Sequence, residues 1–188
     1  MRSPRVLAIG DGDSRVSVAR TLRAAGFTVA EATTARRALD MASDSLDVIV
    51  IHGPLGAESA FELIGKLRSS VLTAVIPILF LSPSFAREDE RLFGADGADA
   101  YLTEPSEPTV LVATIRSLAR VRRLEEAQQS AAAEWQATFD AIGDIVCVID
   151  SHGVITRANR AALASFPQRA ADVIGHPKIG RASCRERV

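Results

Sequence analysis

The residue best placed to do chemistry is His52, which follows four consecutive β-branched residues at positions 48–51. An apolar run of this kind predicts a strand buried on both faces, as at the centre of a parallel sheet. The Gly53-Pro54 pair that comes next ends the strand. In an open α/β sheet, reactants bind just beyond the carboxyl ends of the strands. We therefore predict that His52 lies at the functional edge of the sheet and decides its chemistry.

Other polar, glycine and proline residues follow three of the remaining apolar runs and should reach the same edge. They are Gly10, Asp11, Asp13, Ser82, Glu104 and Pro105. We expect His52 and Glu104 to lie at adjacent strand ends and to form a charge-assisted hydrogen bond. Two alternatives stay open: each side chain points into water, or the pair acts as a pH switch, because histidine titrates near neutrality.

Five predicted strands and five predicted helices alternate along the first 120 residues. The strands are expected at 6–9, 27–32, 46–52, 77–81 and 99–103, and the helices at 14–25, 33–42, 59–68, 87–93 and from 107 onward. Ser14 is expected to cap the first helix. Such alternation predicts an α/β fold, a doubly wound five-stranded parallel sheet with right-handed crossovers, in one domain over residues 1–120.

A long linker helix is predicted to continue to residue 140, because residues 119–140 contain neither glycine nor proline. It is either an exposed connector or a two-stranded coiled coil that relays between domains. We assign the linker helix to residues 121–140. Residues 144–150 and 154–158 then predict two strands around a tight turn, followed by a short helix from Asn159, as the opening of a second α+β domain at 141–178.

Residues 179–188 continue no pattern and match the translation of a common sequencing-adapter sequence. We expect this segment to be a read-through artefact and the second domain to be cut short, so Cys184 carries no functional argument.

Composition excludes several classes of function. The net charge is −1, from 22 basic and 23 acidic residues, which predicts neither a nucleic-acid partner nor an anionic membrane partner. No apolar run approaches the roughly 18–20 residues that a membrane helix needs. The two cysteines lack metal-ligand spacing. We expect a cytoplasmic protein.

Residues 5–120 resemble the receiver domain of two-component response regulators, which has a flavodoxin-like fold. The resemblance rests on VLAIGDGD, LDVIVIH, PILFLS and GADAYLTEP, in this order and spacing. In that family a carboxylate accepts a phosphoryl group, an acidic pair holds Mg²⁺, a lysine neutralises the phosphoryl and a hydroxyl follows it. Transferred by position, the phosphoacceptor falls on His52, and the acidic pair falls on Gly10 and Asp11, with Asp13 nearby. The lysine falls on Glu104, which precedes Pro105. The hydroxyl falls on Ser82 and the switch aromatic on Tyr101.

These replacements imply a pseudo-receiver that keeps the fold and has lost phosphotransfer, with no catalytic residue, no cofactor and doubtful Mg²⁺ binding. Replacing lysine by glutamate turns attraction for a phosphoryl into repulsion, a swing of roughly 2–8 kcal/mol at about 4 Å. The alternatives are an active phosphoacceptor receiver with an unusual pocket, and a flavodoxin-like enzyme. The latter is disfavoured because no GxGxxG loop follows the first strand.

Residues 134–178 resemble the start of a PAS domain. A receiver, a signalling helix and a PAS domain in this order resemble the N-terminal part of a multidomain sensor histidine kinase, whose output domain would follow. The resemblance implies a protein partner or a homodimer, formed through Tyr101, the helix from Glu107 to Leu118 and the linker helix.

Overall fold

The computed structural model describes residues 2–53, 55, 59–83, 97–165 and 173–175. The chain divides into two compact units, Met1–Glu126 and Ala127–Val188. The domain boundaries expected at residues 120 and 140 stay predictions, and the helix expected at 87–93 lies outside the described residues. Among the described helices, none combines the length and the apolar character needed to cross a membrane.

The first unit is built on a five-stranded parallel sheet in the order β2-β1-β3-β4-β5. This order confirms the predicted flavodoxin-like fold. The strands are β1 (Arg5–Ile9), β2 (Thr28–Ala32), β3 (Val48–His52), β4 (Ile78–Ser82) and β5 (Ala100–Thr103).

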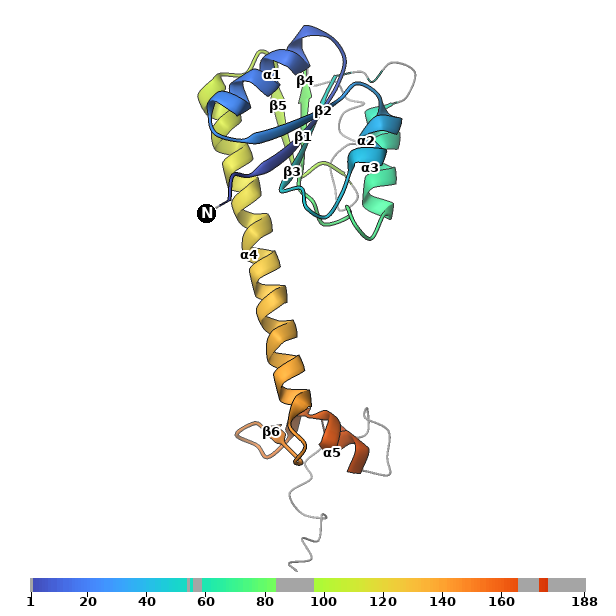
Figure 1. Ribbon diagram of the computed structural model, residues 1–188, viewed down its shortest axis with the longest axis vertical. Helices are drawn as coiled ribbons and strands as arrows, with labels where there is room; N and C mark the ends of the chain where they lie inside the picture. Colours follow the sequence, from blue (N-terminus) through green and yellow to red (C-terminus); the bar gives the residue numbers. More distant parts are fainter. Residues whose placement is uncertain (1, 54, 56–58, 84–96, 166–172, 176–188) are drawn as a thin grey trace, which may run out of the picture. The chain divides into compact units, whose positions relative to one another are not determined.

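Helices cover both faces of the sheet (Figure 1). On one face lie α1 (Gly12–Ala24) and the first part of α4 (Pro108–Ala141), and on the other lie α2 (Ala35–Met41) and α3 (Ala60–Ser69). The central strand β3 shows why an uninterrupted apolar run was needed. Val48 and Val50 pack with α1 and α4, whereas Ile49 and Ile51 pack with α2 and α3.

Local capping sets where the helices begin. The side chains of Thr34 and Ser59 accept hydrogen bonds from the third amide beyond them, at 3.2 Å each. The prediction that Ser14 caps the first helix is wrong, because Asp11 occupies the N-cap position and α1 begins at Gly12. Ser14 instead lies in the first turn of α1, which leaves its hydroxyl available for another contact.

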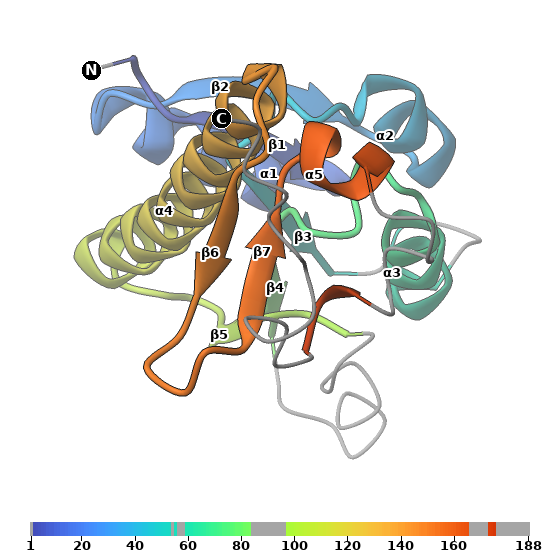
Figure 2. The same cartoon turned by 90° about the horizontal axis from the view of Figure 1, so that it is seen from below.

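In the second unit, β6 (Cys147–Ile149) and β7 (Ile155–Ala158) form an antiparallel hairpin, seen side by side in Figure 2, which precedes α5 (Arg160–Ser165). The buried Asn159 amide ties this unit together. It accepts hydrogen bonds from the amides of Val146 and Ala162 and donates to the carbonyls of Ile142 and Asp144. The strand–turn–strand–helix order agrees with the expectation from sequence, and its assignment to a PAS domain stays a prediction.

Candidate functional site

His52 and Glu104 meet at the carboxyl edge of the sheet. His52 ends β3, Glu104 directly follows β5, and Nε2 of the imidazole is hydrogen-bonded to Oε2 of the carboxylate. This contact confirms the expected pair. Their side chains are only 12% and 14% exposed, so little water competes for the bond.

The expectation that His52 and Glu104 lie on adjacent strand ends is wrong, because β4 lies between β3 and β5. The backbone hydrogen bonds of the sheet continue one residue past the strands on both sides of β4. The Gly53 amide donates to the carbonyl of Leu81 at 2.9 Å, and the Glu104 amide donates to the carbonyl of Ser82 at 2.8 Å. The two long side chains therefore meet across the end of β4.

The hydroxyl of Ser14 completes the carboxylate's surroundings. It donates to the two carboxylate oxygens of Glu104 over 3.0 and 3.2 Å. This role was not predicted from the sequence. The available signal was a hydroxyl group placed shortly after the first strand, near the carboxyl edge of the sheet. Because Ser14 is bonded to the carboxylate and not to the imidazole, the three residues do not form the nucleophile–base relay of a hydrolase.

Gly10 lies directly against residue 52. It directly follows β1 and is buried, with its amide bonded to the carbonyl of Ala32 at 3.1 Å. A Cβ atom at position 10 would lie 3.0 Å from both the Cβ and the carbonyl oxygen of His52. The absence of a side chain at position 10 thus permits the close approach of residue 52, through atoms that any residue with a Cβ would place there.

The carboxylates expected near this edge lie at the start of α1. Asp11 is the N-cap of α1 without a side-chain cap bond, Asp13 lies in the first turn, and both are exposed. Both carboxylates are favourable at this end of the helix dipole. Within the described ranges, no hydrogen bond or ion pair is recorded between either carboxylate and His52 or Glu104.

The Mg²⁺ ion that the flavodoxin-like receivers imply does not fit this set of residues. Mg²⁺ is bound through oxygen atoms in near-octahedral geometry. Position 52 supplies nitrogen, position 10 supplies no side chain, and the Glu104 oxygens already accept bonds from Ser14 and His52. Among the described residues, no group of three His, Cys, Asp or Glu side chains could hold a metal ion.

Three predicted positions remain, Ser82, Tyr101 and Pro105. Ser82 ends β4, between the strands that carry His52 and Glu104. Tyr101 points toward the core on the α2/α3 side, with its ring centroid 6.0 Å from that of Phe80 and its hydroxyl buried. Glu104 and Pro105 also line a cleft of about 380 Å³ that is shared with α1 and is rich in hydroxyl groups.

Comparisons with known proteins agree with this architecture, although no protein-family profile matches the chain. The chain is 33% identical over 108 residues to the phosphate regulon transcriptional regulatory protein PhoB of Pseudomonas aeruginosa, covering 56% of this chain and 47% of PhoB. It is 36% identical over 135 residues to the response regulator MprA of Mycobacterium bovis, covering 69% and 56%. The chain thus spans about half the length of these two relatives.

Solved structures give a fuller match to the first unit. The chemotaxis response regulator CheY4 of Vibrio cholerae shares 30% identity with a TM-score of 0.56, over 62% of this chain and 99% of CheY4. A putative response regulator of Chloroflexus aurantiacus shares 28% identity with a TM-score of 0.56, over 63% and 99%. Since PhoB is by name a transcriptional regulator, the comparisons give no support to the expectation that nucleic acid is not a partner.

Proposed function

The chain belongs, through its N-terminal unit, to the response-regulator receiver family, and we propose that it is a pseudo-receiver, a regulatory module of two-component signalling that does not accept a phosphoryl group. The observation that carries the proposal is the closed contact among His52, Glu104 and Ser14 beside Gly10. The polar side chains at the carboxyl edge of the sheet bond to one another, whereas a phosphoryl site needs polar groups that are available to an anion.

Two physical terms oppose phosphotransfer at this edge. An imidazole replaces the carboxylate whose oxygen would form an acyl phosphate. A carboxylate at position 104 repels a phosphoryl group by about 4 kcal/mol at roughly 4 Å and an effective dielectric constant near 20. A protonated His52 would offset part of that repulsion, but it would then be held by Glu104 and not by the phosphoryl group.

A module of this kind acts through protein contacts. We assign these contacts to the face near Tyr101 and the first part of α4, and to the linker part of the same helix. Val121 and Leu124 are 49% and 60% exposed on α4, and with Gln128 they follow the three–four spacing of a coiled-coil seam. A second copy of the chain is the partner that such a seam fits.

In the proposed arrangement, the linker helix leads from the pseudo-receiver to a PAS sensor domain, and a histidine kinase output domain follows. The hairpin and buried Asn159 of the second unit support the PAS assignment.

Phosphodonor labelling tests the proposal. Wild-type chain is incubated with acetyl phosphate and Mg²⁺ beside a receiver with an intact acidic pocket, and incorporated phosphate is followed by mass spectrometry. We expect no label on the wild type, and slow labelling of a double variant with His52→Asp and Glu104→Lys. Phosphate on wild-type His52 would refute the pseudo-receiver and support the active alternative.

A further inference from the structure

A second charged cluster lies at the opposite edge of the sheet, where the strands begin. Asp47 directly precedes β3, so the central strand runs from Asp47 at one edge to His52 at the other. The Asp47 side chain is 0% exposed. A carboxylate so fully removed from water needs partners, because an unpaired buried charge is strongly destabilising.

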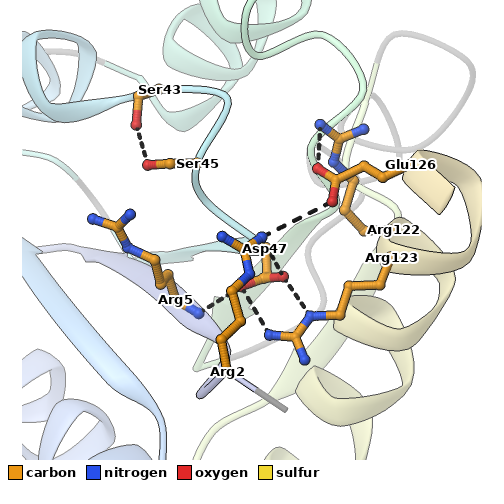
Figure 3. Close-up of polar contacts among 8 residues, drawn as sticks. All are labelled: Arg2, Arg5, Ser43, Ser45, Asp47, Arg122, Arg123 and Glu126. Atoms are coloured by element: carbon orange, nitrogen blue, oxygen red, sulfur yellow. Dashed lines mark hydrogen bonds and ion pairs between the residues drawn. The ribbon is translucent and has the colours of Figure 1, made fainter. Parts of the chain in front are cut away.

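The partners of Asp47 come from three segments of the chain (Figure 3). Arg123 of α4 donates from Nε to Oδ1 at 2.7 Å and from Nη2 to Oδ2 at 3.3 Å. The backbone amide of Arg5 in β1 donates to Oδ2 at 2.7 Å. Near the chain's start, Nη2 of Arg2 lies 3.6 Å from Oδ1. The two-point contact from Arg123 fixes orientation as well as distance.

The cluster continues along α4 for one more turn. Nη2 of the buried Arg122 lies 3.0 Å from Oε1 of Glu126, and Nη2 of Arg2 lies 4.0 Å from Oε2 of the same residue. Glu126 is also the last residue of the first compact unit. The network therefore holds the turn of α4 at which the helix reaches the end of that unit.

Apolar packing stops short of this turn. Leu111, Ile115 and Ala119 bury α4 against the sheet, but Val121 and Leu124 are exposed. Beyond Ala119, ion pairs with Asp47 and Arg2 join α4 to the rest of the first unit, and the Arg122 side chain is buried beside them.

The electrostatics of the pair agree with this role. Burial, the largest single contribution, would raise the pKa of Asp47, but the bonds from Arg123 and the Arg5 amide, with the charges of Arg123 and Arg2, together hold it below its ordinary value. The bond to Asp47 raises the pKa of Arg123 in turn.

We propose that Asp47 is a latch that fixes residues 120–126 of α4 to the amino edge of the sheet, and that loss of its contact with Arg123 releases this part of the helix. Release of this contact would free the part of α4 that leads into the linker helix. It goes beyond the proposed function and does not depend on whether His52 accepts phosphate, because the two edges are bonded through different residues.

Hydrogen–deuterium exchange on the whole chain tests the latch. The variants are Asp47→Asn and Arg123→Gln, and the matched control is Arg120→Gln. Arg120 is exposed on the same helix, and its replacement removes the same charge with the same change in helix propensity. We expect amide exchange in residues 116–126 to accelerate at least about tenfold in both latch variants and to stay unchanged in the control. Exchange in β1, β3 and β4 accelerates less than exchange in residues 116–126.

The double variant, Asp47→Asn with Arg123→Gln, tests whether the two residues act through one shared contact or independently. If Asp47 and Arg123 act as one contact, combining both substitutions accelerates exchange no more than the stronger single substitution. Equal exchange in Arg123→Gln and Arg120→Gln, or effects of the two latch substitutions that simply multiply, would overturn the proposal. Should Asp47→Asn fail to fold, Arg123→Gln decides alone, because its side chain is 25% exposed and its loss leaves the core intact.

Discussion

Replacing Gly10 with alanine should destabilise the first unit through a single contact. The added Cβ would meet the Cβ and the carbonyl oxygen of His52 at 3.0 Å each, and one of these atoms is backbone of the central strand. Relief requires β1 and β3 to separate by a few tenths of an ångström, and both strands lie in the packed interior of the sheet. Overpacking of this kind costs about 1–3 kcal/mol.

Urea unfolding followed by circular dichroism measures this cost, with Gly65→Ala as the matched control. Gly65 lies within α3, and a Cβ there would meet nothing within 4 Å. The control should therefore be stabilised by about 0.5–1 kcal/mol, because alanine is the better helix former. A Gly10→Ala variant as stable as the wild type would refute the view that a side chain at position 10 clashes with residue 52.

Three further predictions concern other contacts. A double-mutant cycle of His52→Ala and Glu104→Ala should give a coupling free energy of about 1–3 kcal/mol in urea unfolding, whereas additive effects would show that the contact is not formed in solution. Because the pKa of Asp47 is lowered in the folded protein, its carboxylate contributes its full stabilisation above the ordinary pKa of 3.8 and loses it as the pH falls through the folded pKa. The difference in unfolding free energy between wild type and Asp47→Asn should therefore shrink below about pH 4. A difference that stays constant with pH would contradict a lowered pKa. Val121→Glu with Leu124→Glu should abolish any concentration-dependent dimer in analytical ultracentrifugation, and an unchanged dimer would move the interface away from this seam.

Much of the first unit could be predicted from the sequence because its signals are local. Runs such as positions 48–51 are buried on both faces, and the strand ends of a parallel sheet share one edge, so His52 and Glu104 could be expected to meet. Strand order was less accessible, because it depends on how the crossovers run, and β4 was found between the two strands expected to be neighbours.

The contacts that the sequence did not reveal join residues far apart in the chain. Ser14 and Glu104 are separated by 90 positions, and Asp47 and Arg123 by 76. No periodicity links such partners, and a serine early in a helix also suits an ordinary cap. An acidic residue directly before a fully buried strand was the one local sign that Asp47 needed a distant cation.

Binding of Mg²⁺ together with beryllofluoride, a phosphoryl mimic, tests whether the carboxyl edge of the sheet has lost its phosphoryl site. Isothermal titration of the wild-type chain should give no saturable heat at millimolar Mg²⁺, while a receiver with an intact acidic pocket titrates under the same conditions. Saturable binding by the wild type that disappears in His52→Ala would show that the carboxyl edge still holds a phosphoryl group, and would refute the pseudo-receiver.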